Sequence, residues 1–166
     1  YTYIQKLITY IAADIHDPIR IGLYGVMDRT LSMFSLGNII RQPFWYTSLG
    51  GSLQTISGTS IIGDVNIWAY AKEIVVNYEG AGRFVTPYYV INIFMIPFSI
   101  LGTFLSINEK GARKKLLFGL AGTAFISIVC GNPLPFELLT LFTAPLLLVL
   151  YLIVVFVIFY ALSYFG

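Results

Sequence analysis

The sequence predicts an all-α integral membrane protein built from transmembrane helices and re-entrant helical hairpins. Three observations lead to that fold class. Of the 166 residues, 57% are hydrophobic and only 11% are charged, and the mean hydropathy is +0.80. Soluble domains carry roughly 25% charged residues. A charge-free apolar run spans 145–165, and prolines interrupt the apolar segment before it, at 130–144. A soluble fold of this composition would need a core too large for so short a chain.

The N-terminal third predicts helices joined by a turn. Residues 1–13 are apolar and aromatic and resemble the end of a helix. The sequence His-Asp-Pro at 16–18 predicts a turn with a solvated histidine, since proline disfavours helix at the residue before it. Residues 19–36 are long enough for a membrane helix and contain Asp28 and Arg29. Charges at that depth face the protein interior or an aqueous cavity. Adjacent residues do not face each other on a helix, so we expect them to have separate partners.

Residues 42–63 differ in composition from the apolar segments of the chain. They are rich in Gly, Ser and Thr and include an aromatic cluster with Phe44 and Trp45. We expect a loop or re-entrant structure, which is tolerated at membrane depth only when it is buried in protein or lines water. A short amphipathic stretch at 65–78 and a polar turn at 79–84 follow.

The C-terminal half predicts membrane-crossing helices. Residues 88–107 match one bilayer thickness, since about 20 residues of helix rise roughly 30 Å. Pro97 should kink this helix. The basic residues of the loop at 108–115 make that loop cytoplasmic by the positive-inside rule. Residues 116–130 are too short to cross fully, whereas 145–165 is the strongest spanning segment.

Other classes of protein are disfavoured. The net charge is only +2, and no aromatic or groove-sized feature accompanies the basic loop, so no nucleic-acid partner is expected. Cys130 is the single cysteine, which predicts neither an intrachain disulfide nor a metal site, and we expect it to pack as a small hydrophobe. No cofactor is predicted. The chain begins at Tyr1 without a visible signal peptide, so we expect it to be part of a longer polypeptide.

The interrupted segment predicts a hairpin that enters the membrane and returns. Its tip is GNPLP at 131–135, and its second arm is FELLTLFTA at 136–144. The prolines free backbone groups that lipid cannot satisfy, so a polar substrate, water or protein must satisfy them. Transporters build binding sites from such discontinuous helices near the midplane. The alternative is a proline-kinked helix that only packs, with Glu137 bonded to a neighbour.

Several stretches, in order and with matching spacing, resemble one family. They are GLYGVMDRTLSMFSLGNIIRQPFW, GDVNIW, GAGRFVTPYYVINIFMIPFSILGTFL and GARKKLLFGLAGTAFISIVCGNPLPFELLTLFTAPLLLVLY. Together they resemble enzyme IIC, the membrane permease subunit of bacterial phosphotransferase-system (PTS) sugar transporters, in the glucose, maltose and N-acetylglucosamine superfamily. The resemblance covers 22–151 and corresponds to the C-terminal part of the family's membrane domain. It implies a multi-pass protein of the bacterial cell membrane.

The resemblance also implies a mechanism and partners. The family's permease domain binds a sugar at hairpin tips and moves it across the bilayer by a rigid-body shift. A phosphocysteine on a IIB domain or subunit then phosphorylates the sugar. Residues 1–166 would be the sugar-binding part, without the N-terminal half or a IIB domain. The family forms homodimers through the half that would precede Tyr1.

This sequence departs from the family at the sugar site. Positions 36–38 are Leu-Gly-Asn where the family has the sequence GLHH, so both histidines are absent. Leu134 replaces the first glutamate of the family's TEPIEF, whereas Glu137 matches the second and Arg29 matches an upstream arginine. A carboxylate can accept a proton from a sugar hydroxyl, and leucine cannot. Each buried hydroxyl left unpaired costs about 1–3 kcal/mol. Whether the complex remains a sugar phosphotransferase is therefore open.

Three functions remain open on the sequence. The first is a sugar permease with an altered substrate, whose polar contacts and stacking surface would be Arg29, Asn38, Asn132, Glu137, Phe44 and Trp45. The second is an enzyme-IIC-like scaffold in a membrane complex that no longer couples to sugar phosphorylation. The third is a fragment that needs its missing half to fold.

Overall fold

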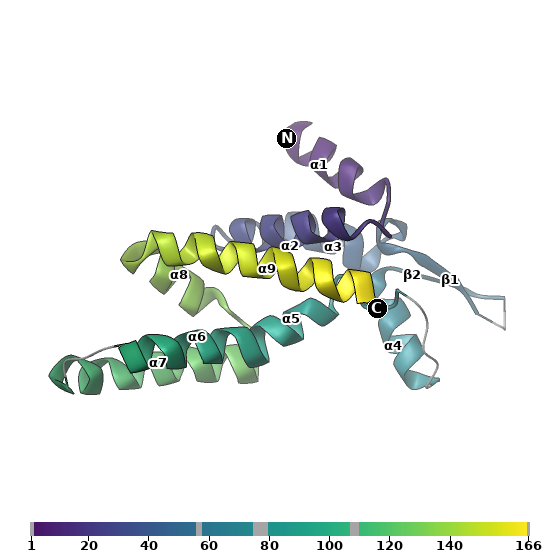
Figure 1. Cartoon of the computed structure of the whole chain (residues 1–166). Coiled ribbons are helices and arrows are strands. Elements are labelled where there is room, and N and C mark those ends of the chain that lie inside the picture. Colours follow the sequence, from purple (N-terminus) through teal and green to yellow (C-terminus); the bar gives the residue numbers. More distant parts are fainter. Residues whose placement is uncertain (1, 56–57, 75–79, 107–109, 166) are drawn as a thin grey trace. The chain divides into compact units, whose positions relative to one another are not determined.

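The computed structural model describes residues 2–55, 58–74, 80–106 and 110–165. The chain divides into two compact units, which are described separately. Unit 1 comprises Tyr1–Pro87 and Tyr151–Gly166, and unit 2 comprises Tyr88–Leu150. Figure 1 shows their elements in sequence colours, and nearly all of these elements are helices. The prediction of an all-α fold therefore holds apart from one small β-ribbon.

Unit 1 begins with two helices joined by a capped turn. Helix α1 spans Thr2–Ala12, and α2 spans Pro18–Ser32. The Asp17 carboxylate accepts the Ile19 N–H at 2.9 Å, and Pro18 occupies the first turn, where its missing N–H costs nothing. The turn predicted at 16–18 is thus the N-cap of α2.

Helix α2 is shorter than the membrane helix predicted at 19–36. It has 15 residues, fewer than the roughly 20 that a bilayer requires. It ends because the Leu36 N–H donates to the Leu31 carbonyl at 2.9 Å and the Ser35 N–H to the Ser32 carbonyl at 3.0 Å. Ser35 has a φ of 61°, so this is a Schellman ending with serine where glycine is usual.

Helix α3, Gly37–Tyr46, runs through Pro43 into the region predicted as loop or re-entrant structure. Ile40 and Phe44 are both fully buried, one helical turn apart, so packing outweighs the backbone bond that Pro43 cannot make. The rest of that region is a 3₁₀ turn, Ser48–Gly50, and strands β1, Ser52–Gln54, and β2, Ser60–Ile62. The strands pair antiparallel with Leu53 opposite Ile61.

Helix α4 spans Asp64–Glu73, within the predicted amphipathic stretch, whose residues 75–78 lie outside the described residues. The core of unit 1 is an aromatic cluster of Tyr24, Phe44, Phe84 and Phe159, all at most 1% exposed. The Tyr24 ring lies 5.2 Å from Phe44, 4.7 Å from Phe84 and 5.8 Å from Phe159, each in edge-on geometry. Edge-on pairs at these distances are favourable beyond the area they bury.

Two glycines of α2 make room for aromatic rings of the C-terminal helix. A Cβ built on Gly22 would lie 2.6 Å from the Phe156 ring, and one on Gly25 would collide with Phe159. Both aromatic residues belong to α9, Pro145–Phe165, whose residues 151–165 are in unit 1. Small residues at helix contacts are typical of membrane proteins.

Unit 2 begins where the chain enters an interrupted helix. Helix α5, Thr86–Val90, continues as a π-helical segment, Ile91–Met95, and then as α6, Ile96–Ser106. The irregularity predicted at Pro97 is therefore a π segment before it. The proline ring conflicts with the carbonyl four residues earlier, which lies inside that segment.

Helix α7 spans Lys110–Cys130 and packs beside α6 (Figure 1). The backbone is already helical at Lys110, so most of the loop predicted at 108–115 is the start of α7, and residues 107–109 lie outside the described residues. Helix α8 spans Leu134–Thr143. Cys130 is exposed, not packed as expected, since it lies at the last position of α7 before the chain turns.

Within the described residues, two segments are long and apolar enough to cross a membrane. They are Thr86–Leu105, of 20 residues, and Pro145–Phe165, of 21 residues. Only 22% and 28% of their most apolar windows are buried, whereas the core helix of a soluble protein is mostly buried. Large apolar side chains such as Phe98, Phe118 and Leu146 are 66%, 90% and 77% exposed. These exposed apolar faces are consistent with a membrane location.

Candidate functional site

The first candidate region is the break between α2 and α3, at residues 33–36. The Asp28 carboxylate is fully buried beside it, and Arg29 is 3% exposed. The Arg29 Nη2 and Nε groups donate to Asp28 Oδ2 at 2.7 and 3.1 Å. From α3, the Arg41 Nη2 and Nε groups donate to Asp28 Oδ2 and Oδ1 at 3.0 and 3.2 Å, and Nη2 also donates to Ser32 Oγ at 3.0 Å. We call Asp28, Arg29, Ser32 and Arg41 the ion cluster.

The ion cluster corrects one prediction. Asp28 and Arg29 were expected to have separate partners, because adjacent residues point to different sides of a helix. They bond directly, since the arginine side chain is long enough to fold back over the preceding residue. Arg41 joins them from another helix, and so one carboxylate fastens α3 to α2.

The other residues of unit 1 that were predicted for a site lie along α3. Asn38 is exposed at the start of α3, next to the break. Trp45 is half-buried, and the Arg41 guanidinium carbon lies 5.2 Å from the centroid of its ring. Phe44 is fully buried, and its ring contacts Tyr24 and Phe84, so core side chains occupy its surface.

The second candidate region is the break between α7 and α8 in unit 2. The structure shortens the predicted hairpin tip to residues 131–133, which we call the tip. Gly131 has a φ of 61°, which suits glycine. Asn132 is exposed, and its Oδ1 accepts the Leu134 N–H at 3.0 Å, so it caps the start of α8.

Glu137 lies in the first turn of α8 and is fully buried. A carboxylate at this end of a helix is favoured by the helix dipole. Leu134, which replaces the family's first glutamate, is half-buried one turn before it. Asn132 and Glu137 therefore lie just before and within α8 in unit 2, while Arg29, Asn38, Phe44 and Trp45 lie in unit 1.

A polar network behind the tip was missed by the sequence reasoning. The Asn92 Nδ2 group, in the π segment, donates to the Gly131 carbonyl at 3.1 Å. The Ser127 hydroxyl, on α7, lies 3.0 Å from the Asn92 carbonyl oxygen and 3.3 Å from Asn92 Oδ1. Asn92 is 5% exposed and Ser127 is fully buried. The signal in the sequence was an amide in the middle of an apolar run.

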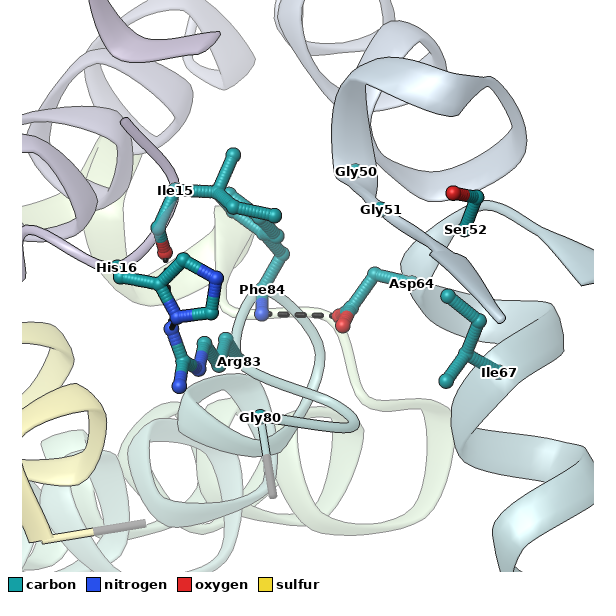
Figure 2. Close-up of a pocket in the computed structure, with 10 residues that line it drawn as sticks. All are labelled: Ile15, His16, Gly50, Gly51, Ser52, Asp64, Ile67, Gly80, Arg83 and Phe84. Carbon is teal, nitrogen blue, oxygen red and sulfur yellow. Dashed lines mark hydrogen bonds between the residues drawn. The ribbon is translucent and has the colours of Figure 1, made fainter. Parts of the chain in front are cut away.

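Unit 1 contains a further polar pocket of about 110 Å³ (Figure 2). Asp64 is 2% exposed there, and its two oxygens accept the Gly82 and Phe84 N–H groups, each at 2.9 Å. Burial raises the pKa of Asp64 to about 6, against the opposing effect of these hydrogen bonds. Asp64 thus fastens the turn at 80–84 to the start of α4.

Arg83 connects the same pocket to the turn before α2. Its Nη1 group donates to the Ile15 carbonyl at 3.1 Å and lies 2.7 Å from His16 Nδ1 (Figure 2). A guanidinium can only donate, so Nδ1 is the acceptor and the imidazole proton is on Nε2. His16 is exposed as predicted, but it has a protein partner. Within the described parts of the chain, no three His, Cys, Asp or Glu side chains could hold a metal ion.

Comparison with known proteins finds a relative of this chain. No family model matches the chain. Over 132 residues, which is 79% of the chain, it is 31% identical to the PTS system glucoside-specific EIICBA component of Staphylococcus carnosus (strain TM300). The matched part is 18% of that much longer protein. The chain is therefore related to part of a PTS component, which agrees with the resemblance found in its motifs.

Proposed function

Since the chain is related to part of a PTS component, we propose that it is the sugar-binding part of a PTS membrane permease. It translocates a sugar that a phosphorylated IIB domain or subunit then phosphorylates. The similarity over 79% of the chain is the observation that supports this proposal most strongly. The relative is described as glucoside-specific, so a glucoside or a related hexose is the substrate class we propose.

Each of the two helix breaks, taken by itself, offers polar groups that suit a sugar. Sugar hydroxyls need both donors and acceptors, and Asn38 and Asn132 offer exposed amides that supply both. Arg29 and Glu137 are buried beside the breaks, where a charged hydrogen bond to a hydroxyl is stronger than a neutral one. Trp45 supplies an aromatic surface on which a sugar can stack, whereas Phe44 packs in the core of unit 1.

The replacement of the family's first glutamate by Leu134 requires compensation within this proposal. Glu137 lies three residues later on α8, nearly one helical turn away. We propose that its carboxylate accepts the hydrogen bond from the sugar hydroxyl that would otherwise bond to the missing glutamate. The site would then hold its sugar at an altered position, consistent with a diverged substrate.

The membrane arrangement belongs to the same proposal. The segments Thr86–Leu105 and Pro145–Phe165 cross the bacterial cell membrane, and the two broken helix pairs enter it as re-entrant hairpins. The basic residues at 110–115 place the start of α7 on the cytoplasmic side.

A second candidate is a scaffold with an enzyme-IIC-like fold that no longer transports sugar. The observation that favours it is the apolar character of the second hairpin. Phe136 is 3% exposed there, and Leu134 stands where the family has a carboxylate. Apolar side chains at these positions can fill a tip instead of binding a ligand.

A thermal-shift assay separates the two candidates. The purified protein, at its full natural length in detergent, is heated with glucose, maltose, N-acetylglucosamine and related glucosides. A ligand at 100 times its dissociation constant stabilises a protein by about 2.7 kcal/mol. The matched variants are Glu137→Gln in the proposed site and Glu73→Gln on the exposed end of α4. A shift that only Glu137→Gln abolishes supports the permease, and a folded protein that ignores every sugar supports the scaffold.

A further inference from the structure

Asn92 differs from the other polar residues of the segment that contains it. The Ser99 and Thr103 hydroxyls donate to carbonyls of their own helix, at 2.8 and 2.9 Å, so they need no partner elsewhere. Asn92 instead bonds to Ser127 of α7 and to Gly131, the residue that follows α7. A buried amide that reaches between segments in an apolar setting holds those segments in one arrangement.

The π segment explains why the Asn92 backbone also needs a partner. In a π turn, a carbonyl accepts from the N–H five residues later, and the Ile96 N–H accordingly donates to the Ile91 carbonyl. The corresponding donor for Asn92 would be residue 97, which is proline and has no N–H. The Ser127 hydroxyl supplies the missing donor at 3.0 Å. The proline, the π segment and Ser127 thus form one consistent arrangement.

The side chain of Asn92 then fixes the tip. Its amide holds the carbonyl of Gly131, the first residue after α7. That carbonyl belongs to a left-handed residue at a helix end, where backbone groups have no helical partner. Asn132 follows directly. The position of Asn132 therefore depends on a bond made by a side chain about forty residues earlier.

We propose that Asn92 is a positioning residue of the sugar site, which holds the tip so that Asn132 and Glu137 meet the sugar in one geometry. This inference rests on the proposed function. In this proposal, Asn92 itself does not contact the sugar. It acts through Gly131, with Ser127 holding the Asn92 backbone in place.

The test uses Asn92→Leu in the full-length protein. Leucine has the same branching and the same number of side-chain heavy atoms as asparagine and suits an apolar environment, so we expect folding to be retained while the amide is lost. Two quantities are measured: sugar affinity, and the rate at which N-ethylmaleimide alkylates Cys130. Cys130 is the single cysteine of this chain, is exposed, and precedes Gly131 directly, so its alkylation rate reports a change in the conformation or mobility of the tip without any sugar.

The expected result for Asn92→Leu is an alkylation rate about tenfold higher and a sugar affinity about tenfold lower, with a melting temperature lowered by only about 2–4 °C, since one neutral hydrogen bond is lost. Ser127→Ala should change both quantities in the same direction. Ser99→Ala, which removes a hydroxyl bonded only within its own helix, should change neither. Unchanged alkylation and affinity in Asn92→Leu would overturn the inference.

The alkylation arm separates this inference from the proposed function. If the native protein binds no sugar but Asn92→Leu still raises the alkylation rate of Cys130, the tip is held as described but the sugar-site proposal fails, and the positioning role falls with it. If the native protein binds sugar and Asn92→Leu binds it equally well, the proposed function stands and the positioning role is refuted.

Discussion

The two helix breaks share a backbone feature but are held by opposite chemistry. Each contains a residue with a φ of 61°, Ser35 in one and Gly131 in the other. At the α2–α3 break, Asp28 accepts four hydrogen bonds from Arg29 and Arg41. At the α7–α8 break, the amide of Asn92 holds the tip through a neutral bond. Removing one member of a buried ion pair costs much more than removing a neutral bond, so the first break should resist change more strongly.

The difference also bears on how each break could serve a transporter. Charged side chains with little solvent contact are stable only while each has its partner of opposite charge. Such a cluster therefore suits a part of the protein whose conformation does not change. A neutral bond worth about 1 kcal/mol can break and re-form at little cost. The comparison therefore gives the α2–α3 break the stronger connection and the α7–α8 tip the weaker one.

The largest expected effect comes from removing the carboxylate of the ion cluster. Asp28→Ala should lower the free energy of unfolding by about 3–5 kcal/mol, because two arginines lose the carboxylate that joins them. Chemical unfolding in detergent measures this. Glu73→Gln, an exposed change of similar charge, should stay within about 0.5 kcal/mol of the native protein. A loss below about 1 kcal/mol for Asp28→Ala would mean that the cluster is not what holds α3 to α2.

The buried Asp64 should also make the stability of unit 1 depend on pH. The folded-state pKa of Asp64 is about 6, above the ordinary value of 3.8. The folded protein therefore binds this proton more tightly than the unfolded chain does. The stability from this proton is fully present below pH 3.8 and is lost as the pH rises through about 6. Since one pKa unit corresponds to about 1.4 kcal/mol, the full change is about 3 kcal/mol.

The measurement is the free energy of unfolding between pH 4 and pH 8, for the native protein and for Asp64→Asn. The variant should lose this part of the pH dependence, because an amide does not titrate in this range. Equal slopes in the two proteins would refute the assignment to Asp64. The Asn92 network has no titrating side chain, so Asn92→Leu should leave the slope as it is.

A smaller effect is expected from filling space at the first break. A Cβ on Gly37 would collide with the Ser32 hydroxyl, which accepts a bond from Arg41. Gly37→Ala should therefore destabilise the protein by about 1–3 kcal/mol, as overpacking typically does. Gly119→Ala is the control, since a Cβ there meets no atom within 4 Å. If both variants have the same melting temperature, the α2–α3 break is looser than the structure indicates.

The sequence predicted the parts of this fold that depend on local patterns. The charge-free run at 145–165 is α9, and Asp17 with Pro18 starts α2, because hydropathy and capping act over a few residues. Non-local contacts were missed. Arg41 reaches Asp28 from another helix, and Asp64 bonds to residues 82 and 84, and neither pairing has a sequence pattern.

The sugar-site residues stay a prediction. The structure has Asn132 just before α8 and Glu137 in its first turn. Asn92 lies in a stretch that carries the family resemblance but was not among the predicted site residues, because its contacts depend on a π segment that no local pattern predicts. The predicted end of α2 was wrong because the helix ends at a serine, not at the glycine that normally marks such a position.

That serine gives the smallest and most direct test of the comparison. Ser35 adopts the left-handed conformation that Gly131 adopts at the other break. A residue with a Cβ is strained there, whereas glycine is not. Ser35→Gly should therefore raise the free energy of unfolding by about 0.5–1 kcal/mol, and Gly131→Ser should lower it by a similar amount. Opposite signs for the two substitutions, measured by chemical unfolding, would show that the breaks share one backbone turn and differ only in the groups that hold them. The same sign for both would show that the two turns are not equivalent.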